Sequence, residues 1–234
     1  MKKSKKRTKI KSIFLIAFLS IVIYFLFSNK ATIINAPYIN QRKLYPTGCE
    51  SVSTVMALNY LGINMTVDYF IDNYLDMGTL PHSDENGTMI GCNPWKAFPG
   101  SPYSEYGYGC FAPVIVNALN KFIDNDEFEI QALYGKSIDE LYHTYIDNDI
   151  PVILWATIDM KPPRLGVSWI DEDTGQSIDW IIPLHCVLLV GYDNNFYYFN
   201  DPMQSKRCKY KKNAVEIAYG GMHRQAVVIK RINN

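Results

Sequence analysis

The sequence has few of the residues that most often bind metal ions in proteins. It contains five cysteines and four histidines. No two of them have the C-x-x-C or H-x-x-x-H spacing that is typical of zinc sites. We therefore expect no metal site in this chain, and any chemistry must come from the side chains themselves.

Basic residues are also scarce outside the N-terminus. Residues 1–30 hold eight Lys and Arg and no acid, which leaves 15 basic and 23 acidic residues, a net charge of −8, in residues 31–234. Nucleic-acid binding depends on a basic face that contacts phosphates. The acidic body therefore argues against nucleic acid as a partner, and the chain has no internal repeat that would suggest an array.

Charged residues are absent from Ile13 to Phe27, which follow a lysine-rich start. A basic segment before an apolar run is typical of a signal peptide or a signal-anchor. No small-x-small cleavage site follows, so we expect an uncleaved anchor that holds the protein in the cell membrane. The positive-inside rule places the rest of the chain outside. Secretion after signal cleavage is the alternative. Residues 31–234 have the length of one ordinary domain.

The stretch from Tyr38 to Gly62 contains a cysteine at a turn that leads into a helix. Cys49 follows Pro-Thr-Gly, and apolar residues then recur at steps of three and four. The start of a helix favours an anion, and the thiolate is the nucleophilic form of cysteine. The side-chain amide of Gln41 can stabilise an oxyanion at the same point. A lone cysteine is more often a small buried hydrophobe, so this assignment depends on the rest of the chain.

A β-hairpin near the C-terminus supplies partners for this cysteine. Residues 184–193 read LHCVLLVGYD and residues 195–202 read NFYYFNDP, with a turn between the two strands. In such a hairpin His185 and Asp201 lie near each other at the open end. Asp201 can then orient the imidazole of His185, whose other nitrogen can exchange a proton with Cys49. The pattern predicts a Cys-His-Asp site with Gln41 as an oxyanion donor.

The middle of the chain predicts further helices and strands around a long loop. The loop, residues 76–110, is rich in glycine, proline and aromatic residues, and we expect it to be an ordered binding loop or a packed surface excursion. Cys92 and Cys110 border it, and Cys186 and Cys208 lie further on. Either pair can form a disulfide, and the sequence does not fix the connectivity. Helices are expected near 66–75, 111–122 and 137–148, and strands near 128–133, 151–158, 164–170 and 180–182.

Several of these segments resemble the C39-like cysteine peptidases of Gram-positive bacteria, a branch of the papain-like superfamily. They include PYINQ, PTGCESVSTVMALNYLG, PVILWATIDM and LHCVLLVGYDNNFYYFNDP. The resemblance implies an α+β fold, with N-terminal helices packed on a C-terminal antiparallel sheet, and no cofactor. It implies Cys49 as nucleophile, His185 as base, Asp201 as orienting residue and Gln41 in the oxyanion hole. Members often have Cys-Gly-Pro-Thr-Ser where this chain has Cys-Glu-Ser-Val-Ser.

The resemblance implies hydrolysis of an amide bond but does not supply the substrate. A peptide and a cell-wall peptide are both consistent with a domain that faces outward. Other possibilities are a peptidoglycan amidase or endopeptidase, a peptidyl transferase in which an amine replaces water, and a surface module that binds without catalysis. The intact set of Gln41, Cys49, His185 and Asp201 argues against the binding module. The sequence does not separate the other functions.

Overall fold

We describe residues 18–19 and 31–232 in a computed structural model of the chain. The predicted anchor, Ile13 to Phe27, lies outside this part apart from two residues, so it stays a prediction. Within the described residues, no helix combines the length and the apolar character that a membrane crossing requires.

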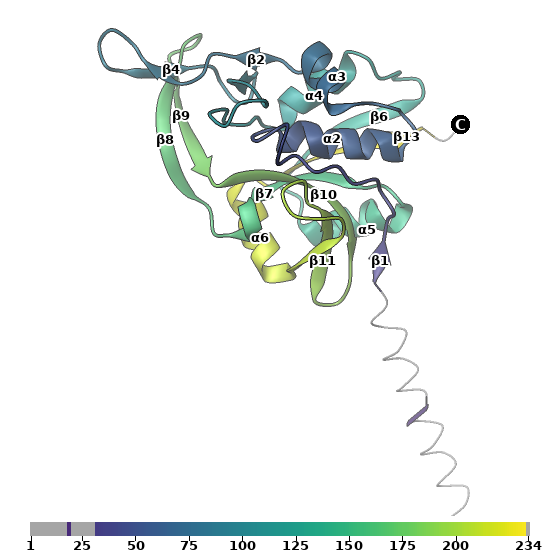
Figure 1. Cartoon of the computed structure of the whole chain (residues 1–234). Coiled ribbons are helices and arrows are strands. Elements are labelled where there is room, and N and C mark those ends of the chain that lie inside the picture. The colour runs from purple at the N-terminus through teal and green to yellow at the C-terminus, as the bar shows by residue number, and fades with distance from the viewer. Residues whose placement is uncertain (1–17, 20–30, 233–234) are drawn as a thin grey trace, which may run out of the picture.

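A seven-stranded antiparallel sheet forms the centre of the fold (Figure 1). Six strands follow the order β12-β11-β10-β7-β13-β6, and β1 pairs with β10. The strands are β1 (Thr32–Ile33), β6 (Phe128–Tyr134), β7 (Val152–Thr157), β10 (Leu184–Tyr192), β11 (Phe196–Asn200), β12 (Cys208–Lys211) and β13 (Gln225–Arg231). All six residues of the central strand β7 are buried, so both faces of the sheet are covered.

Helices cover the two faces of this sheet (Figure 1). They are α2 (Cys49–Tyr60), α3 (Val67–Tyr74), α4 (Ala112–Asn120), α5 (Ile138–Thr144) and α6 (Lys212–Gly221). The first three lie on one side, and α5 and α6 lie on the other. The predicted α+β class is therefore confirmed, with the helix of Cys49 packed against the strand of His185.

Local sequence signals fix where two of these helices begin. Thr66 caps α3 by accepting a hydrogen bond from the N–H of Tyr69. Ser137 and Glu140 form a reciprocal capping box at the start of α5. The helix predicted at 137–148 is shorter than expected, because α5 ends at Thr144 and a 3₁₀ turn, η1 (Ile146–Asn148), follows.

The loop at 76–110 is ordered by pairing with a distant hairpin. Its short strands are β2 (Met77–Gly78), β3 (His82–Ser83), β4 (Met89–Gly91) and β5 (Phe98–Pro99). The hairpin consists of β8 (Arg164–Asp171) and β9 (Ser177–Ile182). It forms a four-stranded sheet with two strands of the loop, in the order β3-β4-β8-β9. The indole N–H of Trp169 also donates to the carbonyl oxygen of Cys92 at 2.9 Å. We call this second sheet, which projects beside the helices in Figure 1, the arm.

Candidate active site

Cys49 is the first residue of α2, at a helix start that has no side-chain cap. Gly48 occupies the capping position and offers no hydrogen-bonding side chain. A Cβ atom at Gly48 would lie 2.9 Å from the Cβ of Tyr45 and 3.2 Å from that of Pro102, so the close packing here requires glycine. The first N–H groups of a helix have no partners within it. This start therefore leaves backbone donors next to a cysteine side chain.

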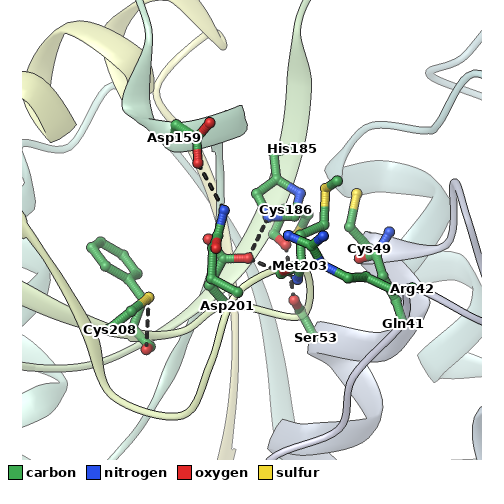
Figure 2. A network of polar contacts seen from close by, with 12 residues as sticks. Gln41, Arg42, Cys49, Ser53, Asp159, His185, Cys186, Asp201, Met203 and Cys208 are labelled. Carbon is green, nitrogen blue, oxygen red and sulfur yellow. Dashed lines mark hydrogen bonds and ion pairs between the residues drawn. The ribbon is translucent and has the colours of Figure 1, made fainter.

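His185 and Asp201 form a buried pair at the open end of the β10–β11 hairpin, as the sequence predicts. Leu188 pairs with Asn200 in the strand register, and Asp201 follows directly. The Nε2 atom of His185 lies 2.7 Å from Oδ1 of Asp201, and both side chains are 1% exposed (Figure 2). A carboxylate only accepts hydrogen bonds, so Nε2 carries the proton. In a neutral ring Nδ1 is then the basic nitrogen.

Asp201 is held in its ionised form by several donors. Burial acts to raise the pKa of its carboxyl group, but the hydrogen bond and charge of His185 and the hydrogen bonds from Met203 and Tyr210 together outweigh this effect and lower the pKa. The N–H of Met203 donates to Oδ1 and the hydroxyl of Tyr210 donates to Oδ2, each at 2.9 Å. Asp201 is therefore fixed in position and suited to orient the imidazole.

The other imidazole nitrogen of His185 makes no hydrogen bond to the described part of the chain. Nδ1 of His185 is buried and has no hydrogen-bond partner among the described residues. Ser53, in the second turn of α2, donates to the carbonyl oxygen of Cys186 at 3.1 Å and so holds α2 against β10. Figure 2 shows the imidazole between Asp201 and the start of α2, with Cys49 and Gln41 on the side away from Asp201.

The thiol of Cys49 is hydrogen-bonded to its neighbour rather than to His185. Its Sγ atom donates to Oε2 of Glu50 at 3.2 Å. Burial raises the pKa of the thiol well above its usual value, and the charge of Glu50 raises it further. The helix start alone predicts a thiolate, whereas burial and the adjacent carboxylate favour the protonated thiol in this state. Glu50 is not among the site residues that the sequence predicts, although an acid directly after Cys49, where members often have glycine, is a usable signal.

Gln41 lies at the same site and is tied to the loop after Asp201. Its backbone N–H donates to the carbonyl oxygen of Pro202 at 3.0 Å, and its side chain is buried. The Nε2 atom donates to the carbonyl oxygen of Pro46 at 3.2 Å. An amide nitrogen carries two hydrogens, so a second N–H remains for a substrate oxygen.

A groove of about 590 Å³ runs along the base of the arm next to these residues. Its lining comprises Glu105, Tyr106, Gly107, Tyr108, Arg164, Leu165, Gly166, Val167, Trp180 and Ile182. Gly109 connects this groove to the site. A Cβ atom there would lie 2.6 Å from Oε1 of Glu50, 3.0 Å from Leu184 and 3.5 Å from Trp180. Gly109, which follows Tyr108 of the lining, therefore packs between Trp180 of the groove and the chain neighbours of Cys49 and His185.

The remaining histidines lie away from Cys49. His82 is exposed, His143 contacts Asp147 on the surface at 3.1 Å, and His223 packs against the ring of Trp95. In the described part of the chain, no cluster of three or more His, Cys, Asp or Glu side chains is arranged to hold a metal ion.

All five cysteines are free thiols, so neither possible disulfide is formed. Cys186 lies on β10 and Cys208 on β12, with β11 between them. Strands two places apart are separated by about 10 Å, which exceeds the Cα–Cα reach of a disulfide. Cys92 and Cys110 are both buried and both unpaired. The loop at 76–110 is therefore held by strand pairing and packing, without a covalent link.

Helices pack on an antiparallel sheet, and Cys49 begins the helix that packs on the strand of His185. This arrangement defines an α+β fold of the papain-like type. The sequence profile of the Peptidase_C39 like family matches residues 33–227, and the chain belongs to this family. It is 28% identical over 189 residues to the uncharacterised protein YvpB of Bacillus subtilis strain 168. The aligned residues cover 81% of this chain and 71% of YvpB.

A solved structure supports the same conclusion about the fold. It is a Bacillus anthracis protein described as a candidate C39-like peptidase, with a TM-score of 0.74 and 25% sequence identity. The match covers 88% of this chain and 99% of that one. The family and the papain-like fold that the sequence predicts are thus confirmed.

Proposed function

We propose that this protein is a thiol peptidase in which Cys49 attacks the carbonyl carbon of a peptide amide bond. The observation that carries the proposal is the buried His185–Asp201 pair. Nδ1 of His185 has no partner among the described residues, and Figure 2 shows the ring between Asp201 and the uncapped helix start of Cys49. Membership of a family described as peptidase-like supports the reaction class. The same family does not specify a substrate, so the proposal names only the bond.

The reaction begins with transfer of the Cys49 proton to Nδ1 of His185. The sulfur then bonds to the carbonyl carbon, and the carbonyl oxygen becomes an oxyanion. In this mechanism the second N–H of Gln41 and the backbone N–H of Cys49 donate to this oxygen. The C–N bond breaks, the amine leaves with the proton from His185, and a thioester remains on Cys49.

Hydrolysis of the thioester completes the cycle. His185 removes a proton from water as the water oxygen attacks the thioester carbon. The thiolate leaves and regains the proton from His185, and the peptide acid is released. Asp201 orients the ring throughout and stabilises the imidazolium that forms twice in the cycle.

The test is product analysis with peptide libraries and with purified cell wall. We expect new amino and carboxyl termini from the wild-type protein and none from Cys49→Ala. Products from cell wall alone would assign an amidase or endopeptidase specificity. Products in which an added amine replaces the new carboxyl group would assign transfer. No product from any substrate, combined with substrate binding, would overturn the proposal in favour of a binding module.

We further propose that the domain acts outside the cell while attached to the membrane. The basic residues of 1–11 and the apolar run from Ile13 to Phe27 support this location. Fractionation of cells that carry a C-terminal tag should place the full-length protein in the membrane, with the tag open to external protease. A shortened product in the medium would indicate a cleaved signal instead.

A further inference from the structure

Glu50 is a fully buried acid that joins two parts of the site. Its Oε2 atom accepts the hydrogen bond from Sγ of Cys49 at 3.2 Å. Its Oε1 atom accepts a hydrogen bond from the N–H of Cys110 at 2.8 Å. Cys110 ends the loop whose residues 105–108 line the groove. One carboxylate therefore contacts both the nucleophile and the segment beside the groove.

The surroundings of Glu50 contain few groups that could neutralise it. Cys49 and the backbone of Glu50 itself face it from α2, Cys110 faces it from the loop, and His185 and Cys186 face it from β10. Burial raises the pKa of Glu50 to about 7, although the backbone N–H groups of Glu50 and Cys110 and the thiol of Cys49 act to lower it. No Lys or Arg forms an ion pair with it among the described residues. An acid in such a place is costly to bury, which indicates a role other than stability.

We propose that Glu50 is a positioning residue that holds Cys49 as a resting thiol and keeps its proton from His185 until a substrate enters the groove. This inference rests on the proposed function, because it describes the state that precedes attack. A thiol has one hydrogen to donate. While that hydrogen is donated to Glu50, Nδ1 of His185 stays without a partner, as observed.

Activation then requires the thiol to turn from Glu50 to His185. The S–H bond breaks, an N–H bond forms at Nδ1, and the thiolate is left to attack the carbonyl carbon. The carboxylate of Glu50 keeps its hydrogen bond from Cys110, so substrate contact with the loop can reach the thiol through Glu50. In the resting state the negative charge beside the sulfur disfavours the thiolate and so limits unproductive alkylation and oxidation.

Glu50→Gln separates the charge from the shape of this side chain. The amide oxygen can still accept from Cys110, but the amide nitrogen faces the sulfur as a donor and stabilises the thiolate. We expect iodoacetamide to label Cys49 of the purified full-length variant about tenfold faster than the wild type at about pH 8.5, where Glu50, with a pKa of about 7, is ionised, with sites resolved by peptide mass spectrometry. Glu85 is exposed on the arm. Glu85→Gln removes the same charge as Glu50→Gln and should leave the labelling rate of Cys49 unchanged.

A gain of less than about threefold, or an equal gain in Glu85→Gln, would overturn the role of Glu50. A second measurement needs only the wild type and Cys49→Ser. The Raman S–H band of the wild type at neutral pH should lose the intensity of one thiol in Cys49→Ser, whereas an unchanged band would mean that Cys49 is already a thiolate. Neither measurement requires turnover, so a failure here is distinct from a failure to find a peptide substrate.

Discussion

At the scale of single residues, the account depends on three side chains that act on one thiol. In the proposed mechanism His185 takes the proton, Asp201 orients His185, and Gln41 stabilises the developing oxyanion. Each role follows from a contact: a 2.7 Å bond between His185 and Asp201, an open Nδ1, and an amide with one hydrogen unused. The roles differ in what a substitution removes, so the variants should fail to different degrees.

Replacing Asp201 separates orientation from charge. Asp201→Ala removes the acceptor for Nε2 of His185, and we expect kcat to fall by about 10²–10⁴-fold. Asp201→Asn keeps an oxygen that can accept from Nε2, and a thiolate beside the imidazolium reduces the need for a further negative charge. It should therefore keep at least about tenfold more activity than Asp201→Ala. Turnover of a peptide found by profiling measures this, with circular dichroism as the folding control. Full activity in Asp201→Ala would reduce Asp201 to a structural residue.

Replacing Gln41 tests the oxyanion donor. Gln41→Ala should lower kcat by about 10²–10³-fold with little change in KM, because the amide gains its contact only as the oxyanion forms. The matched control is Gln176→Ala, at an exposed position in the β8–β9 turn, which should behave as the wild type. If KM rises and kcat is unchanged, the amide binds the substrate uniformly and does not serve the transition state.

At the scale of elements, the arm carries exposed apolar side chains that line a groove. Leu165 is 70% exposed and Val167 is 48% exposed, and both line the groove that ends beside Gly109. Arg164 lies in the same wall and forms no ion pair or side-chain hydrogen bond within the described structure. Exposed apolar side chains next to a cleft are typical of contact sites for a partner or substrate.

Shortening Leu165 should therefore weaken substrate binding more than chemistry. We expect Leu165→Ala to raise KM by about three- to tenfold, because the lost methylene contacts in a groove contribute about 0.7–1.4 kcal/mol. Steady-state kinetics on the profiled peptide measure this. Ile217→Ala removes a side chain that is 54% exposed from α6, on the other side of the sheet, and serves as the control. Equal effects in the two variants would show that the groove does not contact the substrate.

At the scale of the whole molecule, the buried charge of Glu50 links stability to pH. The pKa of Glu50 is raised by burial from 4.5 to about 7 in the folded state. The folded protein therefore binds more protons than the unfolded chain between these values, and this group lowers stability as pH rises through that window. Its destabilising effect is absent below about pH 4.5 and complete above about pH 7.

Glu50→Gln should remove this dependence. The free energy of unfolding of the variant should exceed that of the wild type by about 2–3 kcal/mol near pH 8, and the difference should shrink toward pH 5. Chemical denaturation at the two values measures it, with Glu85→Gln as the charge-matched control. A difference that is the same at both pH values would show that Glu50 is protonated throughout.

The sequence predicts the positions of the candidate site residues better than the long-range strand pairing around them. The Pro-Thr-Gly-Cys turn, the hairpin register and the capping box are local signals, so Cys49, His185, Asp201 and the start of α5 follow from neighbouring residues. The pairing of β4 with β8 joins residues about eighty positions apart, and no local pattern encodes it. The elements β12, α6 and β13 were also not assigned, since α6 ends in two glycines and its helix depends on packing. Glu50 was missed because charge at a helix start usually indicates exposure.

The proposed mechanism requires that Cys49 is a nucleophile and that His185 activates it. A peptidyl epoxysuccinate probe alkylates such a cysteine without knowledge of the natural substrate, and peptide mapping shows which thiol reacts. We predict labelling of Cys49 in the wild type and in Asp201→Asn, loss of labelling in His185→Ala, and no labelling of the other four thiols. Wild-type labelling of His185→Ala, or preferential labelling of another cysteine, would contradict the account.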